Sequence, residues 1–308
     1  MACRGGKGEY EAMNTRQNES AVMDRFEYAT GEDHYFNYCL WPYRPVAPTD
    51  DKFRGINVLY QSFDFAGIDV RAYDFVESIR DAIGAFQTVF GIKQIDGRMG
   101  WEFYFYDYLR KERKVSISKV LEAIRPFARC DIRPNESLPY FMFSIDVDSE
   151  LVSGRRDLDV VHMYVGNVGS KVSSGIAYAL RPQTTTLENF YFFFDAKTQM
   201  LEAADKICCS AFVDVAKINI DRILWPELRD CRTICVANKQ RNDCVYFSEI
   251  NVDQLLFFLK ALAYPRQIIS FFEANRSSLD HLLYDVGLDY RVEGSDVRIL
   301  KSGYYNVF

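Results

Sequence analysis

Hydrophobic and polar positions alternate with a period of two in ten short runs after residue 85. This alternation, in runs rich in Phe, Tyr, Ile and Val, is typical of half-buried β-strands. The runs form five pairs around polar or glycine-containing turns: 88–94 with 101–108, 140–146 with 160–165, 175–180 with 189–195, 233–239 with 244–248, and 288–292 with 297–305. The pattern therefore predicts five β-hairpins.

Amphipathic helical patterns, with apolar residues three and four positions apart, fall between most of the hairpins. Asn251 followed by Gln254 is typical of a capping box at the start of one such helix, and Pro265 follows its end. Residues 56–63 favour an additional strand, and no helical pattern separates the second hairpin from the third. We predict helices over 74–86, 116–127, 197–208, 252–263 and 266–286.

Helices that cover one face of an antiparallel sheet require that face to be apolar, so the alternation assigns each strand residue to a face. On one face the alternating positions are mainly Phe, Ile and Val, with an occasional Trp, as in Trp101, Phe103 and Phe105. On the other face they are tyrosines with scattered single Lys and Arg residues. Exposing so many aromatic rings to water on an open sheet would be energetically costly. A closed barrel would enclose them. We therefore predict an α+β fold with a closed antiparallel β-barrel of about ten strands surrounded by helices.

Composition narrows the remaining possibilities. The 308 residues fit a single barrel domain over 21–308, preceded over 1–20 by a polar segment that we expect to be a disordered tail. With 37 basic and 43 acidic residues and no basic block, nucleic acid is not an expected partner.

No apolar run is long enough to span a membrane, and the start lacks a signal-peptide pattern. The eight cysteines follow no disulfide or zinc spacing, so we expect them to be reduced and the protein to be cytoplasmic. The oligomeric state stays open.

The second face carries candidate chemistry for an allylic diphosphate. Convergent Lys and Arg side chains bind diphosphate oxygens through charge-assisted hydrogen bonds. The candidates are Lys93, Arg181, Lys239, Arg291 and Arg298. Tyrosine rings stabilise a cation and exclude water. The candidates for this shield and for the acceptor pocket are Tyr104, Tyr106, Tyr164, Tyr191, Tyr246 and Tyr304. A carboxylate must hold the N–H or O–H of the acceptor and collect a proton, for which we predict Glu102 first and Asp146 second.

With this organisation the sequence resembles the ABBA aromatic prenyltransferases. The resemblance rests on the order of hairpins and helices over about 70–308, on residues 232–250 before a helix, and on the terminal residues 300–305. It implies transfer of a dimethylallyl or geranyl group to an indole or phenol, with no required cofactor and Mg²⁺ as an optional aid. By this analogy Lys239, Tyr246, Arg298 and Tyr304 correspond to diphosphate-binding positions of the family. His162 departs from it, because members commonly place Lys or Arg two residues from a strand Tyr.

We therefore predict a prenyltransferase whose partners are an allylic diphosphate and an aromatic small molecule, with no resident metal. In a first alternative, the same barrel is a non-catalytic module that binds a ligand or a partner protein. In a second, Asp146-Val-Asp148 is the Mn²⁺-binding Asp-x-Asp motif of a glycosyltransferase. The sequence contains no Asp-Asp-x-x-Asp, Walker loop, Gly-x-Ser-x-Gly or His-Glu-x-x-His motif, so the chemistry of those motifs is not indicated.

Overall fold

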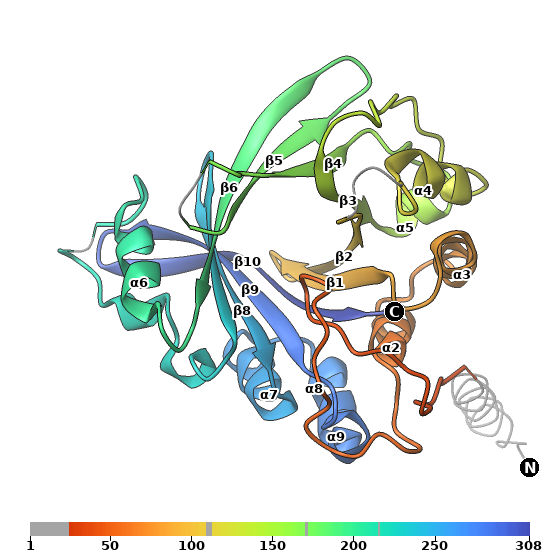
Figure 1. The fold of residues 1–308 in the computed structure, drawn as a ribbon. Coiled ribbons are helices and arrows are strands. Elements are labelled where there is room, and N and C mark those ends of the chain that lie inside the picture. Colours follow the sequence, from red (N-terminus) through yellow and green to blue (C-terminus); the bar gives the residue numbers. More distant parts are fainter. Residues whose placement is uncertain (1–24, 109–112, 170–171, 215) are drawn as a thin grey trace, which may run out of the picture.

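Ten strands form one closed antiparallel barrel, in which each strand pairs with its neighbours along the chain and β1 closes on β10. This is the architecture of a computed structural model that describes residues 25–108, 113–169, 172–214 and 216–308. Helices surround the barrel (Figure 1). The predicted fold class is therefore confirmed. The predicted tail over 1–20 lies outside the described residues.

The strands lie in the five predicted hairpins. The first hairpin turns at Asp96 and Gly97, whose φ angles of 48° and 74° suit the turn that joins two adjacent strands. The strand bounds are β1 (Thr88–Ile95), β2 (Arg98–Tyr106), β3 (Tyr140–Val147), β4 (Val161–Gly166), β5 (Ser174–Leu180), β6 (Thr185–Asp195), β7 (Thr233–Lys239), β8 (Asp243–Ile250), β9 (Tyr284–Glu293) and β10 (Asp296–Val307).

The helices pack their apolar faces against the outside of the barrel. The predicted capping box is confirmed, since the Asn251 side chain accepts from Gln254 N and the Gln254 side chain accepts from Asn251 N. As predicted, the described residues between β4 and β5 contain no helix. The helix bounds are α2 (Ile56–Ala66), α3 (Arg71–Ile83), α4 (Ile117–Ile124), α5 (Ser149–Val152), α6 (Met200–Cys208), α7 (Val252–Ala261), α8 (Arg266–Ala274) and α9 (Arg276–Leu279).

Two predicted elements are wrong. Residues 56–63 form the start of α2 rather than a strand, because Ile56, Leu59 and Phe63 recur at helical spacing and bury one face. The predicted helix over 266–286 ends much earlier, in α8 and α9. Residues from Tyr284 onward instead extend β9. The apolar residues at this junction fit both periods, so the sequence pattern alone did not separate helix from strand.

The alternation within the strands separates two apolar shells. Phe, Ile, Val and Leu face the helices, as where Phe105 stacks on Phe143 at a centroid distance of 4.9 Å. Tyrosines dominate the lumen of the barrel. Two lumen glycines make room for their rings, because a Cβ at Gly91 would lie 2.4 Å from Tyr305 and a Cβ at Gly287 would lie 2.7 Å from Tyr246.

A bulge in β10 reverses the predicted parity at the end of the chain. The register passes from Ile299 opposite Tyr290 to Lys301 opposite Asp289, so that Leu300 is the extra residue. Tyr304 consequently packs in the outer shell against Tyr264 and Phe272, with centroid distances of 5.7 and 5.9 Å. The prediction that Tyr304 lies in the lumen is wrong. Its neighbour Tyr305 lies there instead.

Residues 36–41, here called the N-terminal strap, close part of the lumen. The Tyr38 ring packs among the lumen tyrosines, 5.1 Å from Tyr104 and 5.0 Å from Tyr305 between centroids. Tyr106 and Tyr108 donate hydrogen bonds to the carbonyls of Tyr38 and Cys39. The strap is thus part of the lumen wall.

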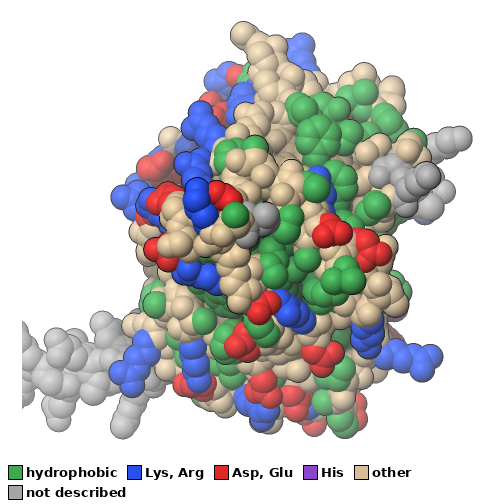
Figure 2. Space-filling model, turned by 90° about the vertical axis from the view of Figure 1, so that its left-hand side faces the viewer, with side chains coloured by type: hydrophobic (Ala, Val, Ile, Leu, Met, Phe, Trp, Pro, Cys, Tyr) green, Lys and Arg blue, Asp and Glu red, His purple; other side chains and the backbone are tan. Residues whose placement is uncertain are grey.

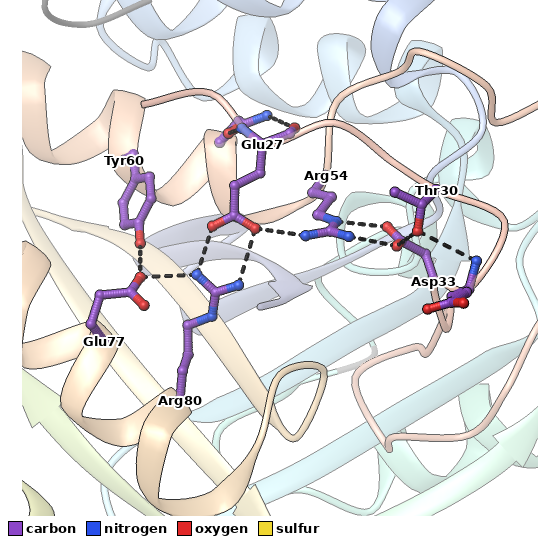
Figure 3. A network of polar contacts seen from close by, with 9 residues as sticks. Glu27, Thr30, Asp33, Arg54, Tyr60, Glu77 and Arg80 are labelled. Atoms are coloured by element: carbon purple, nitrogen blue, oxygen red, sulfur yellow. Dashed lines mark hydrogen bonds and ion pairs between the residues drawn. The ribbon is translucent and has the colours of Figure 1, made fainter. Parts of the chain in front are cut away.

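An ion-pair network holds the segment that carries the strap (Figure 3). Arg54 donates to Asp33 at 2.7 and 2.8 Å and to Glu27 at 3.0 Å. Arg80 on α3 donates to the same Glu27 at 2.6 Å, and Glu77 joins the network through Arg80 at 2.9 Å. The network therefore anchors the residues before and after the strap to α3.

No helix in the described part of the chain is long and apolar enough to cross a bilayer. The described cysteines are all free, as expected for a chain without a disulfide framework.

Candidate functional site

The lumen contains two adjoining cavities that differ in polarity. The charged cavity, of about 500 Å³, is lined by Lys93, Glu102, Asp146, His162, Arg181, Glu188, Lys239, Arg241 and Lys301. The apolar cavity, of about 200 Å³, is lined largely by rings that include Tyr38, Trp41, Tyr106, Tyr108, Phe141 and Phe193. Tyr164, Tyr191 and Tyr246 line both. The tyrosines are therefore a common wall between a charged space and an aromatic one.

Glu102 lies at the centre of the first cluster in the charged cavity. Lys93 Nζ donates to Glu102 Oε1 at 2.7 Å, Lys301 Nζ donates to the same oxygen at 2.9 Å, and the Tyr104 hydroxyl donates to Oε2. Burial alone would raise the pKa of Glu102, but Lys301 and Lys93 outweigh it and hold that pKa well below its ordinary value. A carboxylate held ionised in this way is a weak proton acceptor near neutral pH.

Asp146 extends this cluster toward solvent. Its Oδ1 accepts from Lys93 Nζ at 2.7 Å, and its side chain is 54% exposed. Lys93 therefore bridges a buried and an exposed carboxylate, and both acid–base candidates share one lysine.

Lys239 and Asp289 form the second cluster. Lys239 Nζ donates to both carboxylate oxygens, at 2.9 and 2.8 Å, and Asn242 donates to Oδ2 at 3.2 Å. Burial opposes the charge on each partner, but their mutual attraction raises the pKa of Lys239 and lowers that of Asp289. Lys301 interacts electrostatically with both clusters. Burial alone would lower its pKa, but the negative charges of Glu102 and Asp289 together raise that pKa well above its ordinary value.

His162 and Glu188 form a third pair. Nδ1 of His162 lies 2.6 Å from Glu188 Oε2. Burial would lower the pKa of His162, yet the hydrogen bond and charge of Glu188 raise it. A bulge brings Glu188 to this position, since the β5–β6 register passes from Asn189 to Leu187 across it. The pair adds a titratable cation to the cavity.

Cations slightly outnumber carboxylates here. The cavity is lined by Lys93, Arg181, Lys239, Arg241 and Lys301 together with Glu102, Asp146 and Glu188, and Asp289 pairs with Lys239 without lining it. On the outer face shown in Figure 2, acidic and basic side chains are interspersed around hydrophobic ones. An anion that enters the cavity must therefore share the lysines with the carboxylates that already hold them.

Most of the predicted site residues come together in the lumen. Lys93, Glu102, Tyr104, Asp146, Tyr164, Arg181, Tyr191, Lys239 and Tyr246 line the charged cavity, and Tyr106 lines the apolar one. Arg181 lies at an exposed edge, where its guanidinium group donates to the Thr186 hydroxyl at 3.4 Å.

Arg291, Arg298 and Tyr304 do not line either cavity, which corrects their prediction. Arg291 donates to the Arg241 carbonyl, and its guanidinium lies 5.7 Å from the Phe212 ring. Arg298 is 62% exposed beside Glu293. Both arginines lie at the turn end of the β9–β10 hairpin, so parity alone was insufficient to place them in the lumen. The bulge at Leu300 excludes Tyr304.

Sequence reasoning missed five lumen residues on the last hairpin or the strap. The bulge turns Lys301 and Tyr305 inward, and nothing in the local sequence indicates it. Asp285 and Asp289 share the parity of Arg291 on β9, so a strand begun at Tyr284 would have revealed them. Tyr38 belongs to the strap, whose position depends on long-range contacts.

The Asp-x-Asp pair does not form a joint metal site. Asp146 binds Lys93, whereas Asp148 caps α5 by accepting from Leu151 N at 2.8 Å and pairs with Arg156 at 3.0 Å. Within the described ranges, no group of three or more His, Cys, Asp or Glu side chains is arranged to hold a metal ion. Glu102, Asp146, Glu188 and Asp289 are each paired with Lys or His.

Comparison of the chain with protein-family models and with curated proteins finds no match to either.

Proposed function

We propose that the chain is an aromatic prenyltransferase, which transfers a dimethylallyl or geranyl group from its diphosphate to an indole or phenol. One observation carries this proposal: a closed barrel encloses three lysines next to an aromatic cavity, and the same tyrosines wall both. Diphosphate release requires the first environment, and an apolar acceptor requires the second.

Lys93, Lys239 and Lys301 are the proposed diphosphate ligands. When the C–O bond of the donor breaks, its electron pair stays with the diphosphate, and the ammonium groups stabilise the charge that develops. Lys301 suits this role, since among the described residues its ammonium group donates a hydrogen bond to Glu102 alone. Glu102 then orients two lysines rather than serving as the base.

The tyrosines common to both cavities would shield the allylic cation. Their ring faces stabilise positive charge, and a closed wall keeps out the water that would otherwise capture it. The allylic carbon forms a bond to the aromatic ring. The ring then loses one proton, which the released diphosphate accepts. The geometry thus supports donor and acceptor in adjoining spaces.

A mass-spectrometric assay tests the proposal. Purified protein is incubated with dimethylallyl or geranyl diphosphate and a panel of indoles and phenols. We expect a product heavier than the acceptor by the prenyl group, and we expect Lys301→Met to reduce its formation while the exposed control Arg298→Ala leaves it unchanged. Failure to form any product and to bind either diphosphate would refute the proposal.

A second candidate is a non-catalytic barrel that binds an aromatic or apolar ligand. The observation in its favour is that the three lysines already form ion pairs with carboxylates, so a bound anion is not required to balance their charge. The two candidates separate on diphosphate binding, which only the first requires.

A further inference from the structure

A short polar row interrupts the aromatic wall of the apolar cavity. In the strand register Thr233 on β7 lies opposite Ser248 on β8, and Ser248 lies opposite Asp285 on β9. All three side chains line the apolar cavity. They therefore lie at one level across three adjacent strands, and Asp285 is the acidic residue among them.

The Asp285 carboxyl group is buried but only half satisfied. It is 2% exposed, and its Oδ2 accepts from the strap amide of Tyr38 at 2.8 Å. Its Oδ1 and the Ser248 hydroxyl have no hydrogen-bond partner of ordinary geometry in the described part of the chain, although the Ser248 hydroxyl and the Glu249 amide lie close enough to the carboxyl group to lower its pKa. Buried polar atoms are nearly always paired, so a carboxyl oxygen without a well-formed hydrogen bond on a cavity wall is a group that a ligand donor would pair.

We propose that Asp285 Oδ1 accepts a hydrogen bond from the ring N–H or phenolic O–H of a neutral aromatic molecule in the apolar cavity, beside the Ser248 hydroxyl. The inference rests on the proposed function in one respect, since this molecule would be the acceptor substrate. The binding itself requires no diphosphate and can be measured alone.

The wall of the cavity suits a flat aromatic ring. Rings such as those of Tyr106, Tyr108 and Phe193 give flat apolar contact, which matches an indole or a phenol. Such a molecule carries one strong donor, and Asp285 Oδ1 is the acceptor available for it.

The same contact would orient the acceptor. Asp285 fixes the position of the heteroatom of the ring, and the tyrosines that line both cavities then lie between the ring and the lysines. Asp285 rather than Glu102 is therefore the carboxyl group next to the acceptor, and it lies in the cavity without lysines.

Binding should depend on the charge of Asp285. Burial raises its pKa to about 7, and the charge of Glu249 adds to this effect, against smaller opposing effects of hydrogen bonds from the Ser248 hydroxyl and from the Tyr38 and Glu249 amides. The other ionisable groups near the carboxyl are Glu249 with its partner Arg232, Cys39 and Tyr43 before α2, Tyr106 on β2, and Cys231 before β7. A donor ligand should bind more tightly above about pH 7, where the carboxylate is ionised.

Matched probes test the hydrogen bond without any diphosphate. Indole and 1-methylindole differ only in the N–H, as phenol and anisole differ only in the O–H. By calorimetry at pH 8, we expect the wild-type protein to bind the donor of each pair about 10-fold more tightly or better. This preference should be lost in Asp285→Asn, and it should shrink at pH 5.5.

Asp243→Asn is the matched control, because Asp243 is a buried β8 carboxylate that lines neither cavity. It should keep the preference for indole. Ser248→Ala serves if Asp285→Asn fails to fold, and it should reduce the affinity for indole more than that for 1-methylindole.

Equal affinity of the wild-type protein for indole and 1-methylindole, or no binding of either, would overturn the inference. The inference and the proposed function can fail independently of each other. A preserved N–H preference without prenyl transfer would refute only the enzyme, and prenyl transfer insensitive to Asp285→Asn would refute only the inference.

Discussion

Asp285 and Asp289 lie four residues apart on the same face of β9, yet their surroundings give them opposite properties. Asp289 has Lys239 within 2.9 Å, and its pKa is lowered. Asp285 has no cation beside it among the described residues, and burial raises its pKa to about 7. One strand thus carries an ionised carboxylate that pairs with Lys239 of the charged cavity and, four residues away, a carboxyl group with a pKa near 7 on the wall of the apolar cavity. The comparison teaches that position along the lumen, rather than residue type, assigns the role of a carboxyl group.

The largest expected effect is an opposite pH dependence of stability at these two positions. Between about pH 4 and pH 7, native Asp285 keeps a proton that the unfolded chain has lost, so the free energy of unfolding falls as pH rises through this range. Asp285→Asn should remove this fall and stabilise the protein at pH 8 by up to about 4 kcal/mol. Urea unfolding from pH 4 to pH 8 measures it.

Asp289→Asn is the comparison for that experiment. The lowered pKa of Asp289 stabilises the fold above the unfolded value near pH 4, and this contribution is lost as pH falls below it. The variant should therefore be destabilised at pH 8. If both variants shifted in the same direction at pH 8, the contrast between the two cavities would be wrong.

The next effect is the loss of one partner in the charged cavity. Lys239→Met leaves Asp289 buried without its cation, and we expect the free energy of unfolding to fall by about 2–4 kcal/mol. The double variant Lys239→Met/Asp289→Leu should recover most of the loss, because no unpaired charge remains. Urea unfolding at pH 7 measures the free energy of unfolding of the single and double variants. If the loss in the double variant equalled the sum of the losses in the two single variants, Lys239 and Asp289 would not be coupled.

A smaller effect concerns His162. Glu188 raises the pKa of His162, so the stabilisation from this pair is fully present below about pH 6.5 and is lost as pH rises through the raised value. Since both side chains are partly exposed, His162→Gln should cost about 1 kcal/mol at pH 6 and less at pH 8. Proton NMR titration of the imidazole checks the direction. A pKa below the ordinary value would contradict the assigned pairing.

The smallest effect tests the bulge that separates Tyr304 from the lumen. The Tyr304 hydroxyl is buried in the outer shell without a hydrogen-bond partner among the described residues. Tyr304→Phe should therefore change the free energy of unfolding by no more than about 0.5 kcal/mol, or raise it slightly, and leave diphosphate binding unchanged. If Tyr304→Phe weakened diphosphate binding, the assignment of Tyr304 to the outer shell would be wrong.

The sequence predicted the barrel and one half of the site well, for a physical reason. In the middle strands an uninterrupted period of two carries the parity of Tyr104, Tyr164, Tyr191 and Tyr246 into the lumen. Parity fails where one extra residue enters a strand, as at Glu188 and Leu300. Such bulges depend on pairing with the neighbouring strand, which local sequence does not specify.

The apolar half was harder to predict. Asp285 lies where an apolar pattern fits both a helix and a strand, and the helical interpretation concealed its parity. Tyr38 reaches the lumen through contacts with residues more than sixty positions away, so no local pattern could place it. Glu102 was correctly predicted to face the lumen, but the sequence did not indicate Lys301, and the weak basicity of Glu102 follows from that lysine.

Calorimetric titration with geranyl diphosphate tests the central claim, that the charged cavity is a diphosphate site distinct from the apolar one, most directly. We predict saturable binding to the wild-type protein, weakened about 10-fold or more by Lys301→Met and unchanged by Asp285→Asn or Arg298→Ala. The absence of saturable binding, or equal binding by Lys301→Met, would contradict it.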